Sequence, residues 1–176
     1  MTDTAAAPTR PPAFGDLEPE LSTTRRVLER VADEHWGWKP HDRSKSLGDL
    51  ATHMAEIPFL ASKVLSTDEF DAGGDRWPQG KPASREQLLA AFDAATAAVT
   101  QAIAAVPGHG WTKTWSLKRG GEVFLSMPRA AALRVLGINH LVHHRAQLTV
   151  YLRLLDIPVP SVYGPSADEA RPPVAD

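Results

Sequence analysis

Two histidines stand four residues apart in the stretch Asn139 to Gln147 (NHLVHHRAQ). On an α-helix His140 and His144 project side by side, so their imidazoles can converge on one metal ion. The sequence from about Pro128 to Leu155 carries apolar residues at helical spacing, and both histidines fall within that stripe. Burying an imidazole without a partner costs roughly 1 to 3 kcal/mol. The spacing leaves two interpretations: a metal site, or core histidines satisfied by hydrogen bonds.

A third histidine in the same stretch offers an alternative ligand. His143 lies three residues after His140 and could replace His144. Its direction falls closer to the edge of the apolar stripe, however. We therefore predict that the pair spaced by four residues, His140 and His144, supplies the ligands.

The absence of cysteine restricts the chemistry further. The 176 residues are 43% hydrophobic and 23% charged, values typical of one soluble globular domain. With no cysteine there is no disulfide, no thiolate ligand and no protein-borne sulfur nucleophile. A metal ion in this protein must be held by His, Asp or Glu.

Charge and hydropathy argue against two classes of partner. The net charge is −2 and the isoelectric point about 6.4, and no basic run is longer than Arg25-Arg26, so we expect no nucleic-acid binding. No apolar run approaches the roughly 20 residues that cross a bilayer, and the N-terminal stretch lacks the apolar core of a signal peptide. We expect no membrane association and a cytoplasmic location.

Helical periodicity, together with capping and helix-breaking residues, predicts four helices. The first runs from Leu17 to about His35, the second begins after an N-capping Ser46 and should kink or end at Pro58, the third begins after Ser84 and ends at Pro107-Gly108, and the fourth runs from about Pro128 to Leu155. This pattern predicts an all-α four-helix bundle. The stretch from Trp111 to Leu125, around Arg119-Gly120-Gly121, allows a short hairpin.

We divide the chain into three parts. Residues 1–15 hold several prolines and are expected to form a flexible arm. Residues 16–160 would form the helical bundle. Residues 161–176 are proline-rich and are expected to lie across the outside without regular structure.

His53 supplies a third candidate ligand. It lies between Leu50 and Ile57 on the core side of the predicted second helix, so packing of that helix against the fourth would bring His53, His140 and His144 together. Three neutral imidazoles leave coordination positions open, as in catalytic sites, and suit Zn, Ni, Cu or Fe. Leu141 follows His140, which excludes the zinc-protease motif, and the fourth helix offers no Glu for a di-iron site.

The partners of the outward-facing ring nitrogens are harder to assign from sequence. Asp49, Glu56, Asn139 and Gln147 all lie near the histidines along the chain. Metal-bound histidines usually donate their second ring N–H to such a group. Each of the four is more simply explained as a surface or helix-capping residue.

Two segments resemble a known family. Leu133 to Glu169 resembles the C-terminal half of DinB-like proteins, whose signature helix reads H-x-x-x-H-R-G-Q, and Ser44 to Pro58 (SKSLGDLATHMAEIP) is similar to their second-helix motif with its single His. Ala146 stands where the family commonly has Gly. The resemblance implies an up-down-down-up four-helix bundle with a long crossover, a divalent metal (Zn, Ni or Fe) on His53, His140 and His144, and often a homodimer.

The resemblance also suggests an activity. Some members of the wider superfamily are thiol transferases or isomerases that use a low-molecular-weight thiol such as mycothiol or bacillithiol. Such a cofactor suits a chain without cysteine. We expect a metal-dependent enzyme that activates a thiol or water against a small-molecule substrate, by transfer or hydrolysis. The alternatives are a non-catalytic, metal-binding stress-response module and a protein that binds no metal.

Overall fold

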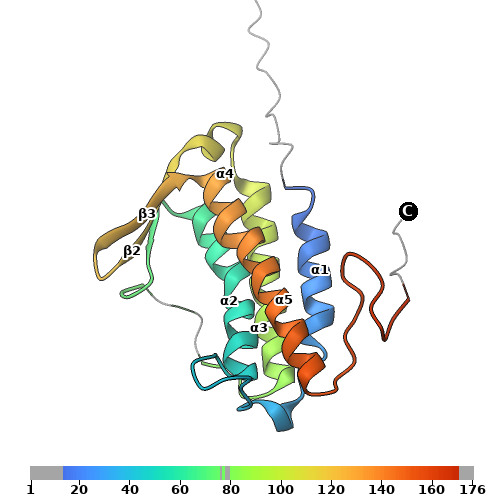
Figure 1. The fold of residues 1–176 in the computed structure, drawn as a ribbon. Coiled ribbons are helices and arrows are strands. Elements are labelled where there is room, and N and C mark those ends of the chain that lie inside the picture. Colours follow the sequence, from blue (N-terminus) through green and yellow to red (C-terminus); the bar gives the residue numbers. More distant parts are fainter. Residues whose placement is uncertain (1–13, 76, 78–79, 171–176) are drawn as a thin grey trace, which may run out of the picture.

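The structure is a computed structural model that describes residues 14–75, 77 and 80–170. Helices dominate it (Figure 1). They are α1 (Leu17–Leu28), α2 (Leu47–Ser66), α3 (Arg85–Ala105) and a C-terminal run of α4 (Arg129–Ala132), the π-helical η3 (Leu133–Asn139) and α5 (His140–Leu154), with 3-10 turns η1 (Asp33–His35) and η2 (Gly108–Thr112). The mainly helical class is confirmed. The predicted arm at residues 1–15 falls almost wholly outside the described residues.

A small sheet makes the all-α description too narrow. It contains β1 (Glu69–Asp71), β2 (Thr114–Arg119) and β3 (Glu122–Pro128), in the order β1-β2-β3. Strands β2 and β3 form the predicted hairpin, and the turn uses positive φ angles of 61° and 84° at Gly120 and Gly121, which glycine adopts without steric cost. Strand β1, which lies between the predicted second and third helices, pairs with β2 in parallel.

The carboxylate of Asp71 connects β1 to the hairpin. It accepts hydrogen bonds from the backbone N–H groups of Gly73 (2.8 Å), Gly120 (2.9 Å) and Gly121 (2.6 Å). A three-residue strand has few ladder bonds of its own, so these side-chain bonds supply much of its attachment. The residues of β2 that pair with β1 are 47 positions away in sequence, which explains why local patterns did not predict the pairing.

The first helix is shorter than predicted. It ends at Leu28 rather than near His35, and the chain turns at Ala32, whose φ of −101° and ψ of 132° are extended. The indole of Trp36 then packs on Gly48, where a Cβ atom would lie only 2.2 Å from the indole nitrogen. Trp36 therefore packs against this end of the core, and Gly48 leaves the space for it.

Capping residues define where α2 and α3 begin, as predicted. Ser46 Oγ accepts from the backbone N–H of Asp49 at 3.1 Å, and Ser84 Oγ accepts from that of Gln87 at 3.3 Å. Helix α2 does not end at Pro58 but continues to Ser66. The missing N–H of a proline removes only one helical hydrogen bond, and burial of Pro58 among packed helices compensates for that loss.

Helix α3 is more apolar than the inspection of hydrophobic runs suggested. Within its 21 residues an 18-residue window has a mean hydropathy of 1.5, enough by length and composition alone to cross a membrane. In this fold α3 packs along α2 and also contacts α1, and Asp93 on its length pairs with Arg25 of α1. The apolar character of α3 is thus partly explained by contacts within the domain.

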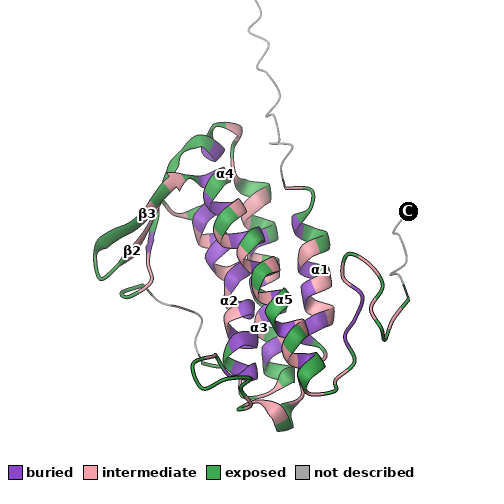
Figure 2. Ribbon diagram, viewed as in Figure 1, coloured by how far each residue is buried: buried purple, intermediate pink, exposed green. Residues whose placement is uncertain are grey.

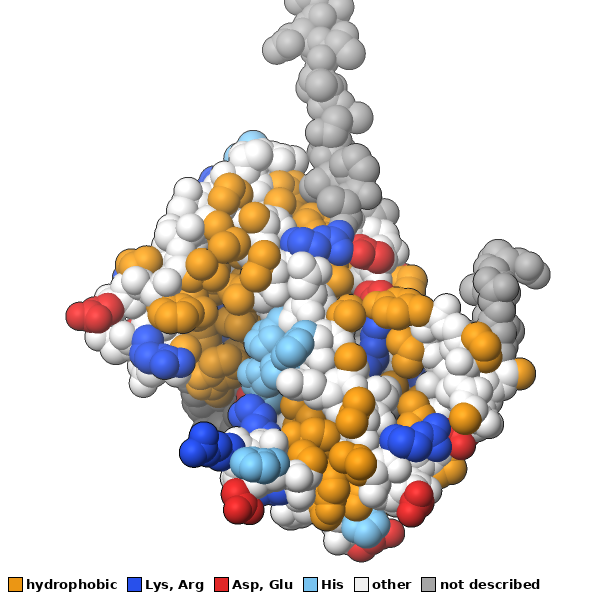
Figure 3. All heavy atoms as spheres, in the orientation of Figure 1, with side chains coloured by type: hydrophobic (Ala, Val, Ile, Leu, Met, Phe, Trp, Pro, Cys, Tyr) orange, Lys and Arg blue, Asp and Glu red, His pale blue; other side chains and the backbone are white. Residues whose placement is uncertain are grey.

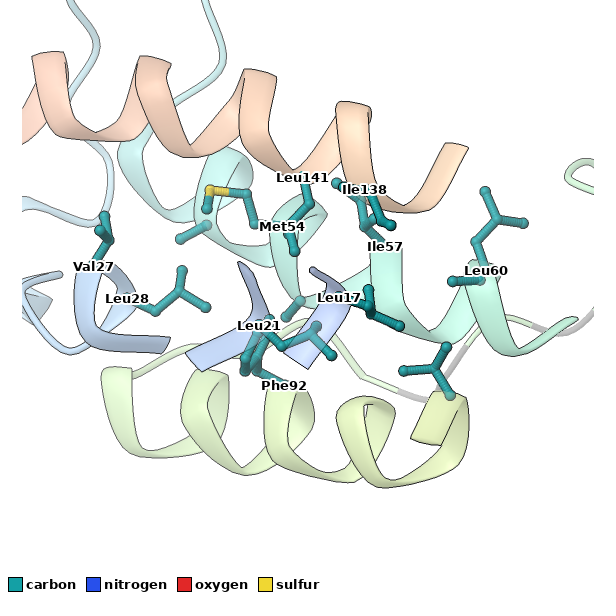
Figure 4. Close-up of a cluster of buried hydrophobic side chains, with 14 of the residues drawn as sticks. Leu17, Leu21, Val27, Leu28, Met54, Ile57, Leu60, Phe92, Ile138 and Leu141 are labelled. Atoms are coloured by element: carbon teal, nitrogen blue, oxygen red, sulfur yellow. The ribbon is translucent and has the colours of Figure 1, made fainter. Parts of the chain in front are cut away.

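One core joins the helical segments. Figure 4 shows side chains from α1, α2, α3 and the C-terminal run meeting between the helices, among them Leu21, Met54, Phe92 and Leu141, which are almost fully buried. Buried positions follow one side of each helix while the outer sides are exposed (Figure 2). The predicted apolar stripes therefore meet in a shared core.

The segment after α5 has no helix or strand up to residue 170 and is fastened by ion pairs. Glu169 pairs with Arg26 at 2.5 Å and Arg30 at 2.8 Å, and Asp168 pairs with Arg153. Up to residue 170 this segment is thus attached to α1 and α5.

Candidate metal centre

Three histidines from two helices converge on one point. His53 lies on α2, His140 begins α5, and His144 follows one turn later. The Nε2 atom of His140 lies 3.2 Å from Nε2 of His53 and 2.9 Å from Nε2 of His144. Each residue offers a ligand nitrogen within 4.8 Å of the other two. The structure thus brings together the three residues selected from the sequence.

The histidines lie at the edge of the helix face rather than at its centre. The sequence analysis placed His140 and His144 among the core positions, but the buried positions of α5 are Leu141, Arg145, Leu148 and Leu152. The buried positions Leu133, Gly137, Leu141, Arg145, Leu148 and Leu152 follow one another at spacings of three and four residues, which places both histidines beside that face. Both histidines are therefore half-buried, and histidine side chains are visible at the surface in Figure 3.

Burial keeps His140 neutral. Burial is the largest cause, and together with the neighbouring imidazoles of His53 and His144 it lowers the pKa of His140 to about 4. The backbone of Leu136 favours the charged form, but Nδ1 of His140 makes no well-formed hydrogen bond within the described chain. At neutral pH the ring carries a free lone pair, the form that binds a metal ion.

A glutamine orients His144. Oε1 of Gln147 lies 2.7 Å from Nδ1 of His144, and since an amide oxygen only accepts, Nδ1 carries the proton. The lone pair of His144 is then on Nε2, which faces the other two rings. Burial lowers the pKa of His144, while the Gln147 bond counteracts part of that shift.

Glu56 is the polar neighbour of His53. One carboxylate oxygen lies 3.6 Å from Nδ1 of His53, longer than a hydrogen bond but within the range of an ion pair. Of the four polar candidates named from the sequence, Glu56 and Gln147 therefore contact the outer ring nitrogens. Asp49 instead bonds Ser46 and lies 3.6 Å from Lys81.

The remaining histidines considered in the sequence lie outside the cluster. His143 is exposed, and its ring contacts His144 edge-on at 4.9 Å without joining the three converging nitrogens. His41 is exposed and accepts a hydrogen bond from the backbone of Arg43. His109 is exposed in η2.

Arg145 is a residue that sequence reasoning missed. Its side chain is 1% exposed and pairs with Glu20 of α1 at 2.6 Å, and it also donates to the Glu20 carbonyl, the Thr24 hydroxyl and the Tyr163 hydroxyl. This network fastens α5 to α1 directly beside His144. The signal in the sequence was a charged residue at a position where helical spacing places the core.

Comparison with known proteins agrees with this architecture. The model of the DinB family matches residues 16–174. The chain belongs to the DinB family. One curated relative, uncharacterized protein YrdA of Bacillus subtilis (strain 168), is 29% identical over 151 residues, covering 85% of each chain.

Solved DinB-like structures share the fold. A DinB-like protein from Bacillus cereus ATCC 10987 superposes with a TM-score of 0.64 at 24% identity, covering 83% of this chain and 92% of its own. YjoA from Bacillus subtilis gives a TM-score of 0.64 at 17% identity, covering 85% and 96%. A putative DinB family member from Exiguobacterium sibiricum gives 0.56 at 19% identity, covering 79% and 86%. The DinB-like fold is thus shared across these proteins.

Proposed function

We propose that this DinB-family protein binds a divalent metal ion, Zn, Ni or Fe, through Nε2 of His53, His140 and His144. The observation that carries the proposal is the approach of three imidazole nitrogens, with 3.2 Å and 2.9 Å between His140 and its two neighbours. Two nitrogens can share one proton, but three converging nitrogens leave lone pairs facing each other. A cation at their centre would satisfy all three.

The donor set fits such an ion. With Zn–N bonds of roughly 2.0 to 2.1 Å, tetrahedral geometry separates two nitrogen ligands by about 3.3 Å, close to the spacings found between these rings. The low pKa of His140 supports a neutral ligand. Gln147 supplies the outer partner that metal-binding histidines commonly have.

We further propose that the protein is an enzyme acting on small molecules. A divalent ion held by three neutral ligands would keep its full charge and lower the pKa of a thiol or water bound in an open position. A low-molecular-weight thiol such as mycothiol or bacillithiol suits a chain that contains no cysteine. The chain itself holds the three rings: Gln147 orients His144, and Arg145 fixes the helix that carries it.

The surroundings of the cluster favour a partly apolar substrate. In Figure 3 hydrophobic side chains extend from the histidine patch toward the hairpin. Phe59, Phe70 and Trp77 contact one another, with ring centroids 5.1 to 6.1 Å apart, between α2 and β1. A transferase or hydrolase acting on a small electrophile with an apolar portion is the function we consider best supported.

Metal binding is tested on protein prepared without a histidine tag. We expect about one equivalent of metal by elemental analysis, and calorimetry should show that His144→Ala loses most of the affinity. His143→Ala is the matched control, because it removes the adjacent exposed imidazole and should bind like the wild type. Equal affinity in both variants would refute the ligand assignment.

Catalysis is tested separately. Metal-loaded and chelated protein are incubated with candidate thiols and a panel of electrophiles, and conjugates or hydrolysis products are measured. We expect turnover only with metal. Metal-dependent stability without any turnover across the panel would favour the alternative function, a non-catalytic stress-response module whose metal fastens α2 to α5.

Further properties follow from family membership as proposals. We propose the up-down-down-up four-helix bundle as the topology, a homodimer as the assembly, and a cytoplasmic location. Analytical ultracentrifugation of the full chain tests the dimer, since a monomer at micromolar concentration would contradict it.

A further inference from the structure

A pocket lies between α2 and α3, which pack along each other (Figure 1). Its volume is about 360 Å³, at the lower end of the range of small-molecule sites. None of its described lining residues is one of the three clustered histidines. The pocket is therefore a separate space from the metal centre, which lies between α2 and α5.

Small apolar residues form most of the lining. Helix α3 contributes Ala91, Ala94, Ala95 and Ala98, and α2 contributes the ring of Phe59. The methyl group of an alanine extends little from its helix, so these residues leave room between α2 and α3. An apolar group placed against them is removed from water, which favours its binding.

Thr52 offers a free hydroxyl to this pocket. The residue is only 6% exposed, yet its Oγ1 forms no hydrogen bond within the described part of the chain. Buried hydroxyls in helices commonly donate to a carbonyl one turn earlier, as Ser66 of α2 does to Ser62 at 2.8 Å. In contrast to the hydroxyl of Thr96, that of Thr52 is not fully enclosed by protein. A molecule in the pocket can therefore bond it.

Glu56 places a carboxylate beside that hydroxyl. It follows Thr52 by four residues on α2, so the two side chains lie on the same side of the helix, and both line the pocket. The Glu56 side chain is 35% exposed, and its contact with Nδ1 of His53, at 3.6 Å, is longer than a hydrogen bond. Its oxygens therefore remain able to accept bonds from a ligand.

The charges around the pocket favour a cation. Among the described lining residues Glu56 is the only charged one. Two nearby lysines have other contacts, since Lys81 pairs with Asp49 at 3.6 Å and Lys63 lies over the ring of Phe59 at 5.0 Å. A carboxylate without a basic partner, in a mainly apolar pocket, attracts a positive group and repels an anion.

We propose that the pocket between α2 and α3 binds a small primary ammonium compound with an apolar body. Its ammonium group donates hydrogen bonds to the carboxylate of Glu56 and the hydroxyl of Thr52, and its apolar body lies against the alanines of α3. An ammonium group has three N–H donors, enough for both acceptors. The test of this site needs neither metal nor catalysis.

The test uses the full chain freed of metal by chelation and dialysis, so that an amine cannot coordinate a metal ion. Fluorine NMR follows the binding of para-fluorobenzylamine, and we expect saturation at one molecule per chain. The uncharged para-fluorobenzyl alcohol should bind about five-fold more weakly, and para-fluorobenzoate more weakly still. No saturable binding of the amine, or equal affinity for the amine and the benzoate, would overturn the proposal.

Two substitutions on α3 locate the site. Ala94 lines the pocket, whereas Ala97 is also exposed on the same helix but does not line it. Ala94→Trp should abolish most of the amine binding, and Ala97→Trp should leave it unchanged. Equal effects of the two variants would contradict binding in this pocket. If Ala94→Trp instead dissociates a dimer in ultracentrifugation, the pocket is a contact between two copies and the proposal is wrong.

Glu56→Gln tests the charge, because glutamine keeps the shape and removes it. We expect the affinity for the amine to fall about ten-fold and that for the alcohol to stay the same. Glu86→Gln is the matched control, since Glu86 is an exposed acid on α3 that does not line the pocket. Equal loss for the amine and the alcohol in Glu56→Gln, or equal loss of amine binding in the two variants, would refute the role of Glu56.

Thr52→Val tests the second hydrogen bond. We expect the affinities for the amine and the alcohol to fall about three-fold, whereas that for para-fluorotoluene, which cannot form the bond, should stay the same. Unchanged amine binding, or an equal loss for all three ligands, would contradict the hydrogen bond to Thr52.

Discussion

At the scale of single residues, the orientation of each imidazole decides whether the cluster can bind a metal. A histidine ring has two nitrogens, and the hydrogen bond made by one sets which of them carries the lone pair. In His144 the 2.7 Å contact between Nδ1 and Oε1 of Gln147 leaves the lone pair on Nε2. His53 has only the more distant Glu56 carboxylate at 3.6 Å.

We predict that Gln147→Ala weakens metal binding by about ten-fold, because His144 loses the partner that fixes its tautomer. Gln147→Glu should restore or strengthen binding, since a carboxylate accepts the same bond. Asn139→Ala, at another exposed amide beside His140, serves as the control. Calorimetric titration measures all three, and equal affinities for the wild type and Gln147→Ala would contradict the role of this glutamine.

The depressed pKa of His140 predicts a pH-dependent stability. The unfolded chain protonates this histidine near pH 6.5, whereas the folded chain does so near pH 4. Between these values the unfolded state binds more protons, so the stabilisation is complete above pH 6.5 and is lost as the pH falls toward 4.

Protonation of His140 in the unfolded chain should lower the unfolding free energy of the metal-free protein by on the order of 2 kcal/mol when the pH falls from 7 to 4.5. Urea denaturation of chelated wild type and His140→Asn at both pH values measures the effect. The variant should lose less stability on acidification. An equal loss of unfolding free energy in the wild type and in His140→Asn would contradict the assignment of the low pKa to His140.

At the scale of elements, a buried ion pair connects α5 to α1. The guanidinium of Arg145 is buried in the core, where it pairs with Glu20 and donates hydrogen bonds to the hydroxyls of Thr24 and Tyr163. Such a pair adds little net stability compared with apolar residues, but removal of one partner leaves the charge of the other buried and unpaired. The pair therefore fixes the position of the helix that presents His140 and His144.

We predict that Arg145→Met lowers the unfolding free energy by about 3 to 5 kcal/mol, because Glu20 is left buried without its partner. Adding Glu20→Met should recover much of that loss. Urea denaturation of the wild type, both single variants and the double variant forms a complete cycle. Strict additivity of the two single losses would show that the pair is not coupled.

At the scale of the whole molecule, the metal centre joins distant parts of the chain. His53 and His140 are 87 residues apart in sequence and belong to α2 and α5, which pack against each other. An ion that binds only the folded arrangement stabilises it by mass action.

We expect metal at one hundred times its Kd to raise the unfolding free energy by about 2.7 kcal/mol. Chelation should reverse this gain, and His144→Ala should show almost none of it. Thermal and urea melts with and without metal provide the measurement. If metal stabilised His144→Ala as much as the wild type, the metal site would lie elsewhere.

The sequence by itself determined what depends on neighbours along the chain. Ser46 and Ser84 marked helix starts, Gly120-Gly121 marked the hairpin turn, and the spacing of His140 and His144 placed two rings on one side of a helix. These features are local because capping bonds, turn geometry and helical periodicity act over only a few residues.

Tertiary structure decided what depends on contacts between distant residues. It placed His53 beside His140, gave Arg145 its partners on α1, and added β1 to the hairpin. It also selected Gln147 and Glu56 from four candidates and placed Leu141 and Arg145, rather than the histidines, on the buried face of α5. No local pattern fixes such choices, because each depends on which helices pack together and on the rotation of each helix about its axis.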